Sequence, residues 1–446
     1  MIYSILRRVI KLALHIFFKK IIVTGEDLFP EQGPVIIVAN HPNTLMDVLI
    51  IASISGNRIG FVANAGIFSN AIMTGFLRYF QVIPIFRKKD VRAGEKTDNN
   101  ASFRKCHEYL GEGKSFLIFP EGSSIHELNL REIKTGTARI ALSFEKLRNF
   151  EGGLNILPVA LDYSDILQFR SMVSVTIEPA ISVSKYKEIY LSDEIEGVNE
   201  LTEDIRKELA KNVPQTSGKE QEDFLIKAHK FYTAYNEPGA ALYEDPGRSL
   251  DIRNQLARAL TYIQIHESRL YEDIKIRMDS FFAELRSSRL TVGFFTNEFL
   301  KKSKVMVCLG YLFTFLFLSP FYIAGLITNY LPYILPSKIF FALKIDIEYK
   351  SSVQLLSGMV LFPFFYFLEF RIFRNYVSDD VWSNVFFLIL LPSSGFITMF
   401  LYTELLRFAR VLRFYFFLKA SEKKKLLGLR DEILERIGVA RKKFFS

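Results

Sequence analysis

The sequence predicts an α/β domain with a mostly parallel sheet covered by helices, then a charged helical region and a C-terminal transmembrane helical region. Three observations lead to this prediction. Short apolar runs rich in β-branched residues alternate with helical patterns over residues 20–185. Residues 186–303 are rich in charge, and residues 304–408 contain long apolar stretches. Short apolar strands separated by helices are typical of a parallel sheet covered on both faces.

The predicted catalytic domain spans residues 24–185. Its apolar runs are predicted as strands at Val35–Val38, Arg58–Val62, Val82–Phe86, Ser115–Phe119, Leu157–Leu161 and Val173–Ile177. Helical patterns lie between several of them, over residues 44–55, 67–80, 101–111 and 134–147. Ligands of such sheets bind beyond the carboxyl ends of the strands, and the polar motifs of this chain fall there.

Residues 1–23 are predicted to form a basic amphipathic helix that lies in the bilayer interface. Lys and Arg side chains alternate there with Ile, Leu and Phe, and the apolar stretch Leu12–Phe18 is short for a signal peptide. No small-residue cleavage site follows this stretch. An ordinary first helix of a soluble domain is the alternative.

Residues 304–408 are predicted to be a transmembrane region. Val305–Leu335, Leu355–Phe370 and Asn384–Leu405 are apolar, and a spanning helix needs ~20 such residues. Basic residues flank the region on both sides, including the basic tail at residues 409–446. Both flanks therefore favour the cytoplasm, which requires an even number of crossings. We expect a hairpin around Pro320 followed by two spans; two crossings with an interfacial first segment is the alternative.

Composition narrows the classes of partner. The formal net charge is +9, and the basic residues are interleaved with apolar runs, which favours an anionic bilayer surface over nucleic acid. Zinc-finger spacing and aromatic RNA-binding signatures are absent from the sequence. The two cysteines, Cys106 and Cys308, are far apart and indicate a reducing setting. The six histidines show no paired ligand spacing, so no metal is predicted.

The first polar motif is His41-Pro42-Asn43-Thr44-Leu45-Met46-Asp47, which directly follows an apolar strand. Pro42 disfavours a helical conformation at His41, and a helix can begin at Thr44, so that Asp47 lies in its first turns. A carboxylate beside an imidazole fixes its tautomer and stabilises the imidazolium. His41 and Asp47 are therefore the candidate catalytic pair, although a helix-capping turn with a solvated aspartate is the simpler interpretation of this motif alone.

Further polar residues follow other strands. Arg87 ends the strand Val82–Phe86 and places a guanidinium, which suits phosphate, at the strand end. Glu121, Gly122 and Ser123 follow the strand Ser115–Phe119 about eighty residues after the first motif. Glu121 is predicted to accept hydrogen bonds from acceptor hydroxyls, Ser123 to donate, and Gly122 to permit close approach. Lys134 precedes a helix start, and the two together form a predicted anion site.

The order of these motifs resembles the glycerolipid acyltransferase superfamily of lysophosphatidate and glycerol-3-phosphate acyltransferases. His-x5-Asp, strand-Arg, Phe-Pro-Glu-Gly, Lys-Thr-Gly and strand-Pro-Val-Ala follow one another over residues 20–185. The resemblance implies that His41 is the general base, that Asp47 orients it, and that Arg87, Glu121 and Gly122 bind the acceptor. It also implies acyl-CoA or acyl carrier protein as the acyl donor, with no other cofactor.

Two departures from the family pattern concern the acceptor. The usual first motif is His-x4-Asp, and this chain has one residue more. The usual Glu-Gly-Thr-Arg is replaced by Glu121-Gly122-Ser123-Ser124, which removes a phosphate-binding arginine. Both departures are similar to the eukaryotic-type glycerol-3-phosphate and dihydroxyacetone-phosphate acyltransferase branch.

The sequence thus predicts a membrane-bound O-acyltransferase of phospholipid biosynthesis, with its catalytic domain and tail on the cytoplasmic side. Its partners would be membrane lipids, the acyl donor and a phosphorylated glycerol-type acceptor: glycerol-3-phosphate, dihydroxyacetone phosphate or lysophosphatidate. Acylation of another lipid hydroxyl, on an amino-acid lipid or a glycolipid, remains open. So does a non-catalytic lipid-binding protein, although a dead copy need not retain His41, Asp47 and Glu121. A hydrolase using Ser123 or Ser124 is the third alternative, but the Gly-x-Ser-x-Gly elbow is missing from the sequence.

Overall fold

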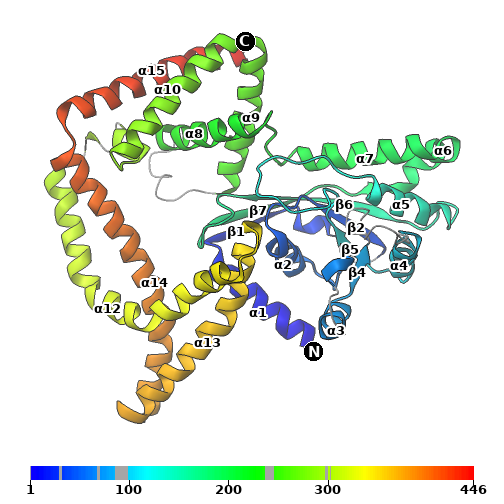
Figure 1. The fold of residues 1–446 in the computed structure, drawn as a ribbon, viewed down its shortest axis with the longest axis horizontal. Coiled ribbons are helices and arrows are strands. Elements are labelled where there is room, and N and C mark those ends of the chain that lie inside the picture. Colours follow the sequence, from blue (N-terminus) through cyan, green and yellow to red (C-terminus); the bar gives the residue numbers. More distant parts are fainter. Residues whose placement is uncertain are drawn as a thin grey trace. The chain divides into compact units, whose positions relative to one another are not determined.

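The computed structural model divides the chain into two compact units. The described residues are 2–29, 33–67, 71–85, 99–236, 246–296, 300–301 and 303–445. The first unit contains Met1–Gln215 together with the short segment Asp346–Ser352, and the second contains Thr216–Ile345 and Val353–Ser446. Figure 1 shows the first unit as a sheet with helices and the second as helices.

The first unit alternates strands and helices, as the sequence predicts. Its strands are β1 (Lys20–Thr24), β2 (Val35–Ala39), β3 (Gly60–Asn64), β4 (Val82–Ile85), β5 (Phe116–Ile118), β6 (Asn155–Tyr163), β7 (Met172–Ile177) and β8 (Ile181–Ser182). Its helices are α1 (Ile2–Phe17), α2 (Thr44–Ile54), α3 (Ala71–Tyr79), α4 (Asn99–Gly111), α5 (Gly136–Lys146), α6 (Lys187–Ser192) and α7 (Glu194–Ala210), with 3-10 turns at Glu26–Leu28, Ala65–Ile67 and Val183–Tyr186. All six predicted strands and all four predicted helices are present, with ends shifted by a few residues.

The described strands form one sheet in the order β1-β7-β6-β2-β5-β3-β4, with β8 paired to β6. Every neighbouring pair is parallel except β6 with β7 and β6 with β8. The predicted mostly parallel sheet is therefore confirmed. Each residue of the central strand β2 is buried, as expected for a strand covered on both faces. The carboxyl ends of β2, β5 and β6 consequently open at one edge of the sheet.

The N-terminal segment differs from its prediction in where the helix stops. Helix α1 ends at Phe17, and Lys20–Thr24 form β1, which pairs with β7 in parallel register. The β-branched run Ile-Ile-Val-Thr favours an extended strand, so the helix predicted over residues 1–23 is too long. Within the first unit α1 packs against α2, and Leu14 and Phe17 of α1 are buried. Its other face leaves an apolar stripe exposed, at Ile5, Val9, Leu12 and Ile16.

The second unit is helical throughout its described residues. Its helices are α8 (Lys219–Asn236), α9 (Pro246–His266), α10 (Ser268–Ser287), α12 (Lys304–Leu343), α13 (Lys350–Tyr376), α14 (Val381–Leu412) and α15 (Ala420–Phe445), with a 3-10 turn at Val292–Phe295 and a π-turn at Arg413–Phe417. The 3-10 turn Ile347–Tyr349, between α12 and α13, belongs to the first unit. The first three residues of α13 belong to the first unit. Helices α8, α9, α10 and α15 pack around buried aromatic side chains such as Phe231 and Phe281.

Among the described residues, three helical stretches are long and apolar enough to cross a membrane: Lys304–Leu343, Ile347–Tyr376 and Val381–Phe417. The predicted hairpin around Pro320 is wrong, because α12 continues through Pro320, Pro332 and Pro336. Proline removes one backbone hydrogen bond and kinks a helix. A kinked apolar helix can nevertheless continue past the proline when neighbouring groups satisfy the freed carbonyl. The ribbon of α12 bends strongly along its length (Figure 1). The number of crossings stays a prediction.

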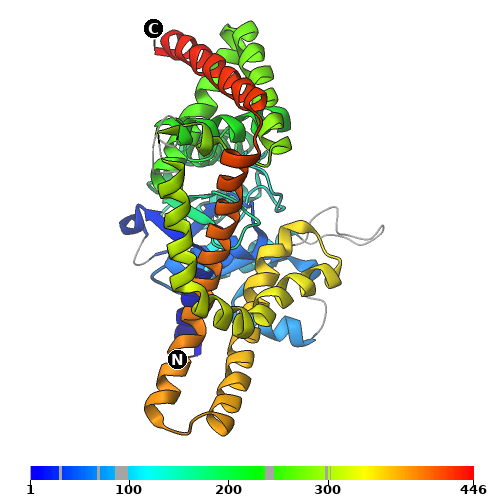
Figure 2. The same cartoon turned by 90° about the vertical axis from the view of Figure 1, so that its left-hand side faces the viewer.

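Helices α12 and α14 lie side by side, as both ribbon views show (Figure 2). Small residues permit this approach: a Cβ on Gly325 would lie 2.3 Å from the Ser394 carbonyl oxygen. The Asn329 side-chain amide donates to the Leu391 backbone carbonyl at 3.1 Å. The Tyr366 hydroxyl of α13 donates to Asn329 Oδ1 at 2.6 Å. Small residues and buried polar contacts of this kind hold apolar helices together in lipid.

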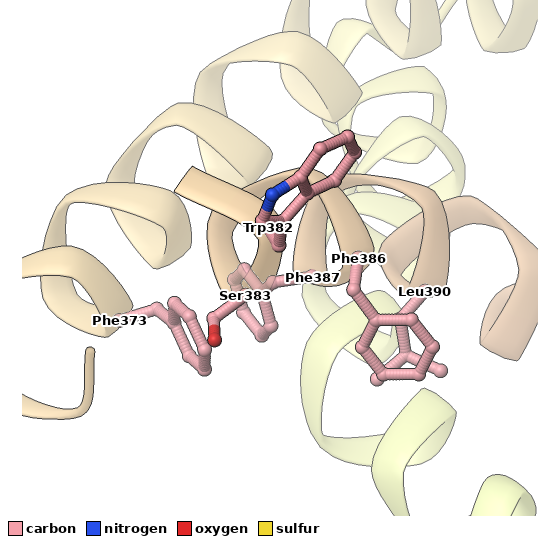
Figure 3. Close-up of a pocket in the computed structure, with 6 residues that line it drawn as sticks. All are labelled: Phe373, Trp382, Ser383, Phe386, Phe387 and Leu390. Carbon is pink, nitrogen blue, oxygen red and sulfur yellow. The ribbon is translucent and has the colours of Figure 1, made fainter. Parts of the chain in front are cut away.

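An open apolar pocket of ≈ 430 Å³ lies between α13 and α14. Figure 3 shows its lining residues, Phe373, Trp382, Ser383, Phe386, Phe387 and Leu390. The rings of Phe373 and Phe387 stack with their centroids 4.1 Å apart. None of these lining residues carries a charge, so the pocket offers apolar contacts and no candidate acid or base.

Candidate active site

The two sequence motifs meet at the carboxyl ends of β2 and β5. These strands are parallel neighbours with Val38 opposite Ile118, so the residues that follow them emerge at the same edge. The His41 backbone N–H donates to Glu121 Oε1 at 3.1 Å. Asn40 locks the end of β2 to β6, because its side-chain amide exchanges two hydrogen bonds with the backbone of Leu161. The two motifs, both expected beyond strand ends, therefore lie next to each other in the structure.

His41 and Asp47 form a hydrogen-bonded pair. The His41 Nδ1 and Asp47 Oδ2 atoms are 2.9 Å apart, and the Asp47 side chain is fully buried. Helix α2 begins at Thr44, so Asp47 falls in its first turn and points back toward the strand end. The Nδ1–H then donates to the carboxylate, which leaves the lone pair of Nε2 available as a proton acceptor. The imidazole stacks on Phe119 with 3.7 Å between ring centroids, which fixes its plane.

Two more donors hold the Asp47 carboxylate. The Asn43 backbone N–H donates to Oδ2 at 2.8 Å, and the Tyr163 hydroxyl donates to Oδ1 at 2.5 Å. Burial raises the pKa of Tyr163 well above its usual 10.0, and the Asp47 charge raises it further. Tyr163 therefore stays protonated and donates at every working pH. The sequence analysis did not identify Tyr163; the available signal was a tyrosine at the end of the strand that pairs with β2.

Tyr163→Phe is expected to lower kcat by ~10-fold, since a hydrogen bond to a charged group contributes ~1.5–3 kcal/mol. Asp47 would lose one of its donors and hold the imidazole less firmly. The KM for the acceptor should change little, because Tyr163 acts through Asp47. Steady-state kinetics on the purified protein measure both constants. Tyr186→Phe is the matched control: its hydroxyl donates to Asp204 at 2.7 Å in α7, and its loss should leave kcat unchanged.

Glu121 lies at the base of the site with both oxygens engaged. Oε1 accepts from His41, and Oε2 lies 2.7 Å from Arg131 Nε. Burial raises the pKa of Glu121, and the Arg131 guanidinium and the His41 N–H oppose this rise. The structure therefore gives Glu121 a bracing role that the sequence did not predict. Each carboxylate oxygen can still accept a further hydrogen bond from a substrate hydroxyl.

Arg131 is a second residue that the sequence analysis missed. Besides its ion pair with Glu121, it donates from Nη1 to Ser123 Oγ at 2.9 Å and from Nη2 to the Ser123 carbonyl. It thus places a guanidinium beside the motif in which Ser123-Ser124 replaces the usual Thr-Arg. Arg131 comes eight residues after Ser123, in a loop, so motif spacing did not indicate that the two residues are in contact. The only sequence feature that pointed to Arg131 was its position shortly before Lys134.

Gly122 and Lys134 lie next to each other. Gly122 has φ +74°, and a Cβ there would lie 2.7 Å from Lys134 Nζ. The Lys134 backbone N–H donates to the Pro120 carbonyl at 2.9 Å, which folds the loop back onto the motif. Glycine is therefore required here both for the left-handed backbone and for the space that the lysine occupies. Lys134 and Arg131 give this turn two cations.

The serine hydroxyls are engaged elsewhere. Ser123 Oγ accepts from Arg131, and Ser124 Oγ accepts from the Thr44 backbone N–H at 2.9 Å. Among the described residues neither hydroxyl bonds to the His41 ring, so the geometry of a serine nucleophile with its base is not present there. Arg87 lies outside the described residues. Within the described ranges, no three His, Cys, Asp or Glu side chains cluster in a way that would hold a metal ion.

Comparisons with known proteins find similarity to acyltransferases. A family model described as Acyltransferase matches residues 20–162. A 1-acyl-sn-glycerol-3-phosphate acyltransferase of Borreliella burgdorferi is 28% identical over 193 residues, 42% of this chain and 71% of that protein. A chloroplast 1-acyl-sn-glycerol-3-phosphate acyltransferase of Arabidopsis thaliana is 27% identical over 145 residues, 32% of this chain and 36% of that protein.

A solved structure is also similar. The 1-acyl-sn-glycerophosphate acyltransferase PlsC of Thermotoga maritima is 19% identical, with a TM-score of 0.34, over 48% of this chain and 81% of that chain. The matched residues 20–162 contain both motifs, the predicted catalytic pair and the strands that position them. Residues 20–162 match the acyltransferase family model, and over this part the chain is similar to glycerolipid acyltransferases.

Proposed function

We propose that this acyltransferase transfers a fatty acyl group from acyl-CoA or acyl carrier protein to a hydroxyl of a phosphorylated glycerol lipid precursor, with lysophosphatidate as the first acceptor to test. Glycerol-3-phosphate and dihydroxyacetone phosphate are the other acceptors of this class. The observation that supports the proposal most strongly is the His41–Asp47 pair beside the Glu121–Arg131 ion pair. A base and a cation next to each other suit an acceptor that carries both a hydroxyl and a phosphate.

The geometry accounts for a direct transfer. His41 Nε2 accepts the proton of the acceptor hydroxyl while its oxygen attacks the thioester carbonyl. The buried Asp47 stabilises the imidazolium that forms. When the tetrahedral intermediate collapses, the carbon–sulfur bond breaks, and the imidazolium returns its proton to the departing thiolate. The products are an ester and a free thiol, and the histidine is neutral again.

Recognition of the acceptor phosphate falls to the cations around the Glu121-Gly122 turn. Arg131 has two guanidinium N–H groups beyond those used for Glu121 and Ser123, and a guanidinium binds phosphate through paired hydrogen bonds. Lys134 is exposed at the same turn, next to Gly122. Arg87, by the family resemblance, would add a third cation.

Membrane attachment fits an acceptor that resides in the bilayer. The exposed stripe of α1 carries Ile5, Val9, Leu12 and Ile16, and Arg8 and Lys11 lie beside it. An apolar stripe with flanking basic residues suits insertion into an anionic leaflet. The three apolar helical stretches are compatible with an integral membrane protein. We place the catalytic domain on the cytoplasmic side because basic residues flank the apolar region.

The test is acyl transfer by the purified, detergent-solubilised full chain. Labelled palmitoyl-CoA or palmitoyl carrier protein is offered with lysophosphatidate, glycerol-3-phosphate, dihydroxyacetone phosphate, an amino-acid lipid precursor or a monoglycosylated lipid. Product from a phosphorylated acceptor supports the proposal. Product from an unphosphorylated acceptor alone would mean that the protein acylates another lipid hydroxyl instead. Labelling by a serine-directed phosphonate would indicate the hydrolase, and folded protein without any product would indicate a lipid-binding role.

Arg131→Gln is expected to reduce kcat/KM for lysophosphatidate by ~10²-fold, because a charge-assisted hydrogen bond contributes ~1.5–3 kcal/mol. The reduction for monoacylglycerol, which lacks the phosphate, should be several times smaller. The ratio of the two kcat/KM values is the measurement, since it cancels any general loss from the Glu121 contact. Arg139→Gln, at an exposed position of α5, is the control. An unchanged ratio would remove Arg131 from phosphate binding.

A further inference from the structure

The first unit includes one short segment from late in the chain. Asp346–Ser352 joins α12 to α13 and packs with the catalytic domain, about three hundred residues after the first motif. We call this segment the connector. Its serines Ser351 and Ser352 are 0% and 3% exposed. Burial of two hydroxyl groups is unfavourable unless both find partners, and both partners belong to the first motif or its neighbourhood.

Three polar contacts of the connector reach the first motif or its neighbourhood. Ser351 Oγ donates to the Ile166 carbonyl at 2.7 Å, the same carbonyl that the Asn43 side chain contacts at 3.4 Å. Thr44 Oγ1 donates to the Glu348 carbonyl at 2.9 Å and lies 3.2 Å from Ser352 Oγ. These contacts converge on Asn43 and Thr44, the residues that separate His41 from the helix bearing Asp47.

Thr44 has an unfavourable backbone conformation. Its φ is +42°, in the left-handed region that β-branched residues rarely adopt. Such a conformation is unfavourable and persists only where the surroundings fix it. Here Ser124 fixes the Thr44 backbone N–H, and the connector fixes the Thr44 hydroxyl. The turn at Thr44 directs the first residues of α2, and the Asn43 N–H and Asp47 of this turn are bonded to each other.

We propose that the connector is a positioning element for the His41–Asp47 pair, with Thr44 as the residue through which it acts. This inference rests on the proposed function. It assigns a role to a segment outside residues 20–162, the part that the acyltransferase family model matches. It also means that the connector between the apolar helices α12 and α13 helps to hold the turn between His41 and Asp47.

The first test compares two substitutions of Thr44 in the full-length protein. Thr44→Val keeps the shape and β-branching but removes the hydroxyl; Thr44→Ser keeps the hydroxyl. We expect Thr44→Val to lower kcat by ~10- to 100-fold, as small misplacements of reacting groups do. KM should change little, and Thr44→Ser should stay near wild type. The Ser351→Ala/Ser352→Ala variant should reproduce Thr44→Val, and Ser357→Ala, whose hydroxyl bonds back within α13, is the control.

A second readout does not depend on turnover. The Nδ1–H proton of His41, bonded to Asp47, is followed as a downfield ¹H NMR resonance and assigned by its loss in His41→Ala. It should persist in wild type and Thr44→Ser and disappear or broaden in Thr44→Val. Equal kcat and an equal resonance in all Thr44 variants would overturn the inference, as would an equal loss in Val and Ser. If wild type makes no product but the resonance behaves as stated, the proposed function fails and the positioning role stands.

Discussion

His41→Ala is expected to lower kcat by ~10²–10⁴-fold, the usual contribution of a general base. The Nε2 lone pair that accepts the acceptor proton disappears, while the main-chain N–H that contacts Glu121 remains. The KM values for donor and acceptor should change much less than kcat, because the substrates still bind. Steady-state kinetics with saturating acyl donor measure this loss.

His266→Ala provides the matched control for this prediction. His266 is exposed at the end of α9 in the second unit, so its removal tests whether loss of any histidine affects turnover. Thermal unfolding of His41→Ala should remain close to wild type, since the ring is partly exposed. Turnover of folded His41→Ala at the wild-type rate would show that the imidazole takes no proton in the reaction.

Asp47→Asn is expected to have the second large effect, again ~10²–10⁴-fold in kcat. Three donors converge on the Asp47 carboxylate: His41 Nδ1–H, the Asn43 N–H and the Tyr163 hydroxyl. The asparagine amide has only one acceptor oxygen, so its NH₂ donor would face at least one of these three donors. The imidazole would then change tautomer, and no charge would stabilise the imidazolium.

Another buried carboxylate, Glu145, provides a control that distinguishes a catalytic effect from a loss of stability. Glu145 is 0% exposed and accepts from the backbone N–H groups of Gly152 and Leu154 at 3.0 and 2.6 Å. Glu145→Gln should lower the free energy of unfolding by ~1–3 kcal/mol, as Asp47→Asn should. Only Asp47→Asn should also lower kcat in the protein that remains folded. If the two variants lose activity equally, Asp47 has a structural role alone.

The parts of the fold that the sequence predicted share a physical basis. Val35–Ala39 and Phe116–Ile118 are short, apolar and fully buried, so their pattern indicates covered parallel strands. Parallel strands end at the same edge of the sheet, so His41 and Glu121, which follow two such strands, lie close together. The His41–Asp47 contact followed from the helix start after Pro42, a local feature that spacing alone reveals.

The missed residues depend on contacts that spacing does not encode. Arg131 reaches Ser123 from an irregular loop, where no periodicity specifies which side chain turns inward. Tyr163 ends a strand that is apolar for packing reasons, so its hydroxyl was hidden in a core pattern. The contact of Thr44 with the connector joins residues 304 positions apart, and no local signal links such segments. Pro320 was predicted to lie at the turn of a hairpin, whereas α12 continues through it.

The most direct test of the central claim is release of free thiol from palmitoyl-CoA with and without lysophosphatidate. A proton-abstracting His41 that activates the acceptor hydroxyl predicts thiol release only when the acceptor is present, with one phosphatidate formed for each thiol. His41→Ala should abolish both signals together. Thiol release by wild-type protein without acceptor, or an unchanged rate in His41→Ala, would contradict direct transfer by this site.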